Sequence, residues 1–271
     1  MVFPTICPTG TWNSVGTLIG NSSSALKNVA VDLLSGSAYA VHFAVPNGQL
    51  LNVAVPYTAI ASNLAGAWGT TVDHYSNVYV AYAVSVLKYP GGTLVAGGAG
   101  GQTSPGMAYG IFVDCFGAIY VTDHAYHRIQ LWTNSSVGVT IIGSQNGTSG
   151  SGPNDLLAPI DVKLDQQGNI YVLDTNNNRI QKYPPGGGTG STVGILPANS
   201  GANSLFVDDC GNFYVSQTSG IYQFTSVSGS GTLIPLTFTG TSNGIAFDAQ
   251  MNLHINVNNG AVGSTYKYAY I

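Results

Sequence analysis

Short apolar strands that end in aspartate recur along the whole chain. The aspartates that end them are Asp32, Asp73, Asp114, Asp165, Asp208 and Asp248. A polar turn follows, and in most copies a second apolar strand starts about four residues later, as in "NVYV", "AIYV", "NIYV" and "NFYV". This unit, repeated at intervals of roughly 40–50 residues, has the length of a propeller blade and predicts an all-β repeat protein.

Each unit predicts four antiparallel strands, and the fourth usually ends in glycine, as in "GTLVAGG" and "VTIIG". One such sheet cannot bury both of its faces, whereas about six sheets packed around an axis can. We therefore predict a single domain, residues 1–271, that forms a six-bladed β-propeller. The expected blades are residues 21–65, 66–100, 101–150, 151–198, 199–240, and 241–271 together with 10–20.

The two ends of the chain predict how the ring closes. The last unit stops at "STYKYAYI", which supplies a third strand but no fourth. The stretch "TWNSVGTLIG", residues 11–20, is similar to "WTNSSVGVTIIG" after the third unit, so it reads as a fourth strand without its first three. We expect this N-terminal strand to complete the last blade and to remove its open edge.

Two hairpins repeat the same charged pattern without a gap. "AIYVTDHAYHRIQLW" carries Asp123 and Arg128, and "NIYVLDTNNNRIQKY" carries Asp174 and Arg179 at the matching positions. Both hairpins resemble the NHL repeat, in which an aromatic–Val–x–Asp strand is followed by Asn–His–Arg–Ile–Gln. We expect each aspartate to pair with its arginine and to fix the geometry of the blade.

The resemblance to the NHL repeat implies a fold more firmly than a function. The other units have lost the pair, and Tyr82, Gln217 and Val257 stand in place of the aspartate in units two, five and six. The family includes lyases, receptor ectodomains, ligase scaffolds and RNA-binding proteins, so membership leaves the activity open.

The sequence predicts no catalytic, cofactor-binding or metal-binding residues. The lyase relatives imply a histidine-rich zinc site, but the five histidines here do not fall at equivalent blade positions: His42, His74, His124, His127 and His254. The repeated aspartates could form a ring of carboxylates for Ca²⁺. Because each precedes a turn such as "QQGN" or "DCGN", we expect them to accept backbone N–H groups instead. No GxSxG, P-loop or HExxH motif is present.

The scarcity of charge excludes nucleic acid as a partner, and the lack of a long apolar run excludes insertion into a membrane. Charged residues make up 7% of the chain and the net charge is −4, with 7 Lys and Arg in total. So few cations cannot build the basic face that nucleic acid requires. No apolar run is long enough to span a bilayer. The start, "MVFPTICPTG", has neither the basic nor the apolar region of a signal peptide, so a secreted chain would have lost its leader.

Three sequons and three cysteines favour a secreted protein. The sequons begin at Asn21, Asn134 and Asn146, all expected on peripheral, exposed segments where N-linked glycan can be accommodated. Cys7 and Cys210 fall in neighbouring blades on the same expected face. Cys115 lies two blades from Cys210, too far for a disulfide. We therefore predict a Cys7–Cys210 disulfide, with Cys115 buried and reduced.

These observations predict a secreted, non-enzymatic binding or structural module. Low charge with many Tyr, Asn and Ser residues suits contacts with protein or glycan. If copies of the protein exchanged the terminal strand, they would also self-assemble, as a homo-oligomer or filament. The alternative is an enzyme, an NHL-type lyase or lactone hydrolase with a metal in the central channel. A metal assay and converging histidines and carboxylates would distinguish the two.

Overall fold

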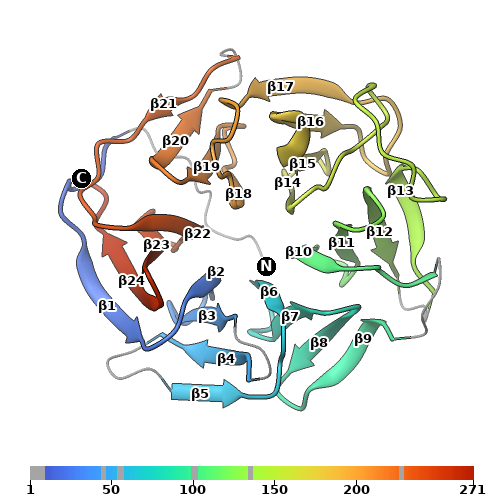
Figure 1. The fold of residues 1–271 in the computed structure, drawn as a ribbon. Coiled ribbons are helices and arrows are strands. Elements are labelled where there is room, and N and C mark those ends of the chain that lie inside the picture. The colour runs from blue at the N-terminus through green and yellow to red at the C-terminus, as the bar shows by residue number, and fades with distance from the viewer. Residues whose placement is uncertain (1–9, 44–46, 54–57, 99–102, 134–136, 226–228) are drawn as a thin grey trace.

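Six four-stranded antiparallel sheets surround a common axis, as the sequence predicted (Figure 1). In this computed structural model the described part of the chain comprises residues 10–43, 47–53, 58–98, 103–133, 137–225 and 229–271. From the innermost strand outward, blade one consists of β2 (Leu26–Val31), β3 (Ala38–His42), β4 (Gln49–Asn52) and β5 (Thr58–Ala61), and blade two of β6 (Ala67–Val72), β7 (Val78–Tyr82), β8 (Ser85–Tyr89) and β9 (Thr93–Gly97). Blade three consists of β10 (Ala108–Val113), β11 (Ile119–Asp123), β12 (Arg128–Trp132) and β13 (Val139–Gly143), and blade four of β14 (Asp161–Leu164), β15 (Ile170–Asp174), β16 (Arg179–Tyr183) and β17 (Ser191–Ile195). Blade five consists of β18 (Ser204–Val207), β19 (Phe213–Gln217), β20 (Gly220–Phe224) and β21 (Thr232–Leu233), and the last blade of β22 (Thr241–Phe247), β23 (Leu253–Asn259), β24 (Val262–Tyr268) and β1 (Thr17–Ser22).

The ring closes between the two ends of the chain. β1 pairs antiparallel with β24, from Thr17 opposite Lys267 to Ser22 opposite Gly263, and the two strands lie side by side in Figure 1. The strand ends at Ser22 rather than at residue 20, because pairing with β24 continues through that position. Trp12 precedes the strand and is buried in the core of the last blade. The N-terminal segment therefore supplies both an outer strand and a core side chain.

The innermost strands define two faces of the propeller. All six run in the same direction, so they begin on one face, which we call the start face, and end on the other, the turn face. On the turn face each repeated aspartate accepts the N–H of the residue two positions later, as in Asp165 with Gln167 at 3.0 Å. The carboxylates are therefore used inside their own turns and do not converge on a shared cation.

Neighbouring blades are joined at the start face by hydrogen bonds from the second strand of one blade to the innermost strand region of the next. Thr122 donates to the Ile160 carbonyl at 3.1 Å, and Ser216 donates to the Asn243 carbonyl at 2.6 Å. The innermost strands also approach one another closely. A Cβ atom at Gly110 would lie 2.5 Å from the Cα of Asp161, so glycine is required where β10 and β14 meet.

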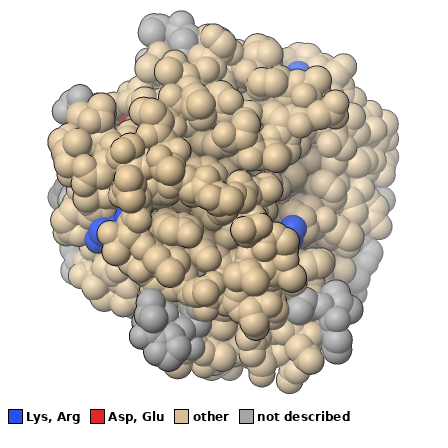
Figure 2. All heavy atoms as spheres, turned by 60° about the vertical axis from the view of Figure 1, so that its left-hand side comes forward, with Lys and Arg blue, Asp and Glu red and all other residues tan. Residues whose placement is uncertain are grey.

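The surface carries few charges, as the composition requires. Figure 2 shows one side of the molecule, where uncharged residues cover almost all of the visible surface and only isolated charged atoms appear. No helix among the described residues is long and apolar enough to cross a membrane.

Candidate functional site

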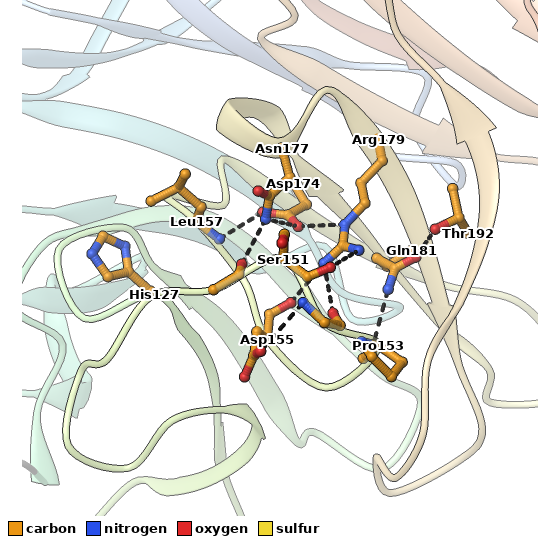
Figure 3. A network of polar contacts seen from close by, with 12 residues as sticks. His127, Ser151, Pro153, Asp155, Leu157, Asp174, Asn177, Arg179, Gln181 and Thr192 are labelled. Atoms are coloured by element: carbon orange, nitrogen blue, oxygen red, sulfur yellow. Dashed lines mark hydrogen bonds and ion pairs between the residues drawn. The ribbon is translucent and has the colours of Figure 1, made fainter.

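The repeated Asp–Arg hairpins form buried networks inside their blades. Arg179 Nε lies 2.8 Å from Asp174 Oδ2, and its guanidinium donates to three backbone carbonyls of residues 151–155 (Figure 3). Asp174 Oδ1 accepts the Leu157 N–H at 2.8 Å. Burial raises the pKa of Asp174, against the opposing effect of these donors. The pair therefore ties the loop before β14 to the β15–β16 hairpin.

The third blade repeats this arrangement with different loop partners. Arg128 Nε lies 2.9 Å from Asp123 Oδ2, and both side chains are fully buried. The guanidinium also donates to the carbonyls of Ser104 and Gln145. Every nitrogen of this arginine has a partner within the blade and the side chain is fully buried, so it is not accessible to a ligand.

Replacing Arg179 by Ala should lower the free energy of unfolding by about 3–5 kcal/mol, because the substitution leaves Asp174 buried without its counter-charge. Lys182→Ala is the matched control on the same strand, since Lys182 Nζ lies 3.7 Å from Asp165 Oδ2 and 35% of the lysine side chain is exposed. That control should cost at most about 1 kcal/mol. Urea denaturation of both variants measures the difference, and equal losses would contradict a framework role for the buried pair.

A row of rings crosses the start face over blades one to three. Lys27, Trp68 and Tyr109 are each the second residue of an innermost strand, so they occupy equivalent positions in β2, β6 and β10. The Trp68 and Tyr109 rings stack with centroids 4.0 Å apart, and the Tyr109 ring stacks on His124 at 4.2 Å. Phe43 meets Trp68 edge-on at 5.8 Å. All five side chains are partly exposed, so the row is accessible to a ligand.

Among the described residues, Lys27 is the only Lys or Arg whose side chain lacks a carboxylate within 4.0 Å. The other six cations all have one. Lys27 Nζ instead lies 4.1 Å from the Trp68 ring centroid and 5.3 Å from that of Phe43. Burial lowers the pKa of Lys27. A half-buried ammonium with only aromatic neighbours is suited to bind an electron-rich group of a ligand.

His124 ends the row with one nitrogen fixed and one available. Its Nδ1 lies 3.2 Å from the Pro159 carbonyl, which can only accept, so Nδ1 carries the proton and Nε2 carries the lone pair. Burial lowers the pKa of His124, against the effect of this hydrogen bond, and so favours the neutral ring. His127 holds the same loop by accepting the Ala158 N–H at Nδ1, at 3.0 Å. The β11–β12 loop therefore presents a neutral, oriented imidazole at the start face.

The channel wall beside the row does not fit a metal ion. Asp161 is the one carboxylate at the start of an innermost strand, and Lys163 Nζ lies 2.6 Å from its Oδ1. Its Oδ2 accepts the Leu205 N–H at 2.9 Å. An ammonium group thus occupies the position that a cation would take. Across the described residues, no group of three or more His, Cys, Asp or Glu side chains could hold a metal.

The five histidines are distributed over both faces. His42 is buried at the end of β3, and its ring nitrogens have no partner among the described residues. His74 lies in the turn after β6, on the turn face, opposite the face that holds His124. His254 is buried on β23 with Nε2 3.2 Å from Asp248.

The structure describes two of the three cysteines and the asparagines of two of the three sequons. Cys115 is free but exposed, not buried, because it is the first residue of the turn that follows Asp114. Cys210 is disulfide-bonded, and its expected partner Cys7 lies outside the described residues. Asn21 and Asn146 are exposed, whereas Asn134 lies outside the described residues. Glycosylation at these positions, secretion, and a protein or glycan partner stay predictions.

The sequence does contain a signal for the row of rings. Lys27, Trp68 and Tyr109 each stand five residues before a repeated aspartate, whereas the other three units have Ile160, Asn203 and Asn243 there. Aligning the units on their aspartates would have shown two aromatic residues and a lysine at one structural position in successive blades. The stacking with the β11–β12 loop could not be read from that alignment.

Solved structures with the same fold include several enzymes. A gluconolactonase from Xanthomonas campestris has 16% sequence identity and a TM-score of 0.71, and the match covers 98% of this chain and 97% of that chain. Virginiamycin B lyase from Staphylococcus aureus has 15% identity and a TM-score of 0.61, covering 93% and 87%. The calcium-binding protein regucalcin from Agrobacterium tumefaciens has 12% identity and a TM-score of 0.67, covering 96% and 99%. No curated protein sequence matches the chain.

These similarities correct the functional prediction. We predicted a non-enzymatic binding or structural module, but the chain shares its architecture over nearly its full length with a lactonase and a lyase. The prediction failed because it was based on the absence of catalytic sequence motifs. Propeller enzymes assemble their sites from single residues on different blades, which leaves no contiguous motif.

The family match falls on the blade that contains the best-formed hairpin. Residues 156–183 match the model of the NHL repeat, and this segment includes Asp174, Arg179 and the loop residue Leu157 that they hold. The remaining blades repeat the same four-stranded unit with the turn-capping aspartate retained. The chain is therefore a six-bladed β-propeller in which one blade, around residues 156–183, matches the NHL repeat.

Proposed function

We propose that the protein is a hydrolase that opens a lactone ring at the start face of the propeller. The observation that carries the proposal is His124, a half-buried imidazole whose Nδ1 is held by the Pro159 carbonyl and whose Nε2 is free to accept a proton. A neutral, oriented imidazole is the commonest general base in ester hydrolysis. The lactonase activity of one structurally similar protein supports the choice of an ester ring as substrate.

The proposed reaction uses groups of the row in sequence. His124 Nε2 accepts a proton from water as the water oxygen attacks the carbonyl carbon of the lactone. The ring C–O bond then breaks, and the protonated imidazole returns the proton to the leaving oxygen, which yields a hydroxy acid. The edges of Trp68 and Tyr109 supply apolar contact along the substrate. Lys27, at the other end of the row, binds an electron-rich group of the substrate.

The proposed reaction does not use a metal ion, because the Asp161–Lys163 pair does not fit one. In this respect the proposal differs from the alternative given by the sequence, an enzyme with a metal in the central channel. Lys163 holds Asp161, and Ser204 Oγ lies 3.3 Å from its Oδ2, so these three groups form a satisfied structural cluster under the row.

A panel of lactones of different ring sizes tests the proposal. We expect turnover of at least one of them, followed by proton release, with a product heavier than the substrate by one water. A lyase acting on a cyclic ester would instead open the ring by elimination and leave the mass unchanged. A product of unchanged mass would therefore reject hydrolysis in favour of elimination, and the absence of turnover across the panel would reject lactonase activity.

In the pH profile of that reaction, the rate should fall on the acidic side only at pH values below the ordinary pKa of histidine. A histidine acts as a base only when it is neutral, and burial lowers the pKa of His124 from the ordinary value of 6.5. The fraction of neutral imidazole therefore stays high as the pH falls through 6.5 and drops only below that. Measured between about pH 5 and pH 8, kcat/KM should decline with a midpoint below 6.5. A midpoint above 6.5 would contradict His124 as the base.

A further inference from the structure

A pocket of about 550 Å³ lies between blades two and three on the turn face. The β6–β7 turn, β9, the β10–β11 turn and the end of β12 form its walls. Because β6 and β10 begin at the row of rings and end at this pocket, the two sites lie on opposite faces of the propeller. The pocket therefore plays no part in the proposed lactone site.

One turn aspartate in this pocket differs from all the others. In four of the six turns an asparagine four residues after the aspartate donates to its Oδ2, and in a fifth, that of Asp32, Ser35 does so. At Asp114 the corresponding residue is Ala118, which offers only its backbone N–H, to Oδ1. Oδ2 of Asp114 thus has no hydrogen-bond partner among the described residues, and the side chain lines the pocket.

The charge of the pocket favours a cation. Asp73 and Asp114 carry two negative charges, and Lys88 supplies one positive charge through a loose 3.9 Å contact with Asp73. Asp73 is otherwise satisfied by Asn77 and Tyr79. The uncompensated charge therefore resides at Asp114, the carboxylate with an open oxygen.

The apolar part of the pocket favours an aromatic ring. Phe116 is 89% exposed and Tyr75 is 74% exposed at the rim, which is unusual for side chains of this size. Trp132 also lines the pocket, with almost all of its side chain buried in the wall. The pocket therefore offers aromatic surface to the ring of a ligand.

We propose that this pocket binds a small arylalkylamine. The ammonium group pairs with Asp114 Oδ2, and the ring lies among the aromatic side chains. The two features act together, because one molecule with a cationic group and an aromatic ring matches both the net negative charge and the aromatic walls.

Cys115 makes the proposal measurable, because this exposed free thiol lies in the same wall as Asp114. Its alkylation by iodoacetamide is followed by peptide mass, with tyramine, the neutral analogue tyrosol and the anionic analogue 3-(4-hydroxyphenyl)propanoate as probes. Tyramine should slow alkylation saturably, tyrosol should protect more weakly, and the anion should not protect. Equal protection by all three probes, or no protection by tyramine, would overturn the proposal.

Asp114→Asn separates the charge from the rest of the pocket. Asparagine Oδ1 can still accept the two backbone N–H groups of the turn, so the fold is retained. The affinity for tyramine should fall roughly fivefold, the upper range for a solvent-accessible ion pair, while that for tyrosol stays unchanged. Asp165→Asn, the same change in the equivalent turn of blade four, should alter neither affinity. An unchanged affinity of Asp114→Asn for tyramine would overturn the assignment of the ammonium partner.

Discussion

Removing residues 1–22 should leave a protein that no longer unfolds cooperatively and that aggregates. The deletion takes away β1, which pairs with β24 along five residue pairs, and exposes the hydrogen-bonding edge of β24. It also removes Trp12, which packs edge-on against Tyr214 and Phe247 and donates through Nε1 to the Met251 carbonyl at 2.9 Å. Light scattering and thermal unfolding measure both effects. A truncated chain that stays monomeric and equally stable would show that the ring does not depend on this strand.

A point substitution gives a graded form of the same prediction. Trp12→Ala should lower the free energy of unfolding by about 3–5 kcal/mol, the usual loss for a buried tryptophan, with the strand itself intact. Val15→Ala is the matched control in the same segment, since Val15 is 72% exposed, and should change stability by less than about 0.5 kcal/mol. Similar losses in both variants would mean that Trp12 does not anchor the closing segment.

The fold could be predicted from the sequence because each blade is encoded locally. The turn aspartates show this: each of them caps the backbone of its own turn, within four residues, so the pattern is visible along the chain. Strand closure was also visible, because the terminal segment resembles another fourth strand in the same sequence.

The candidate site could not be predicted in the same way, because it joins side chains from different blades. Tyr109 lies on β10 and His124 in the β11–β12 loop of blade three, and Trp68 comes from blade two, so their stacking depends on how blades pack. The tautomer of His124 depends on Pro159, which precedes β14 in the next blade. Cys115 was predicted to be buried because it was left without a disulfide partner, whereas its turn projects it outward.

His124→Asn should abolish lactone hydrolysis while leaving the fold intact. The asparagine amide nitrogen can take the place of Nδ1 and donate to the Pro159 carbonyl, so the loop keeps its hydrogen bond. The variant has no group that can replace Nε2 as a base. Loss of a positioned general base reduces kcat by about 10²–10⁴-fold, with little change in KM where ground-state binding is unaffected.

The matched control for this variant is His127→Asn, three residues further along the same loop. There the asparagine carbonyl oxygen can replace Nδ1 as the acceptor of the Ala158 N–H, and the row of rings is not altered. We expect kcat within a few-fold of the unmodified protein and an unchanged melting temperature in both variants. If His127→Asn lost as much activity as His124→Asn, the effect would come from the loop and not from the base. If His124→Asn kept its activity, the proposed base would be wrong.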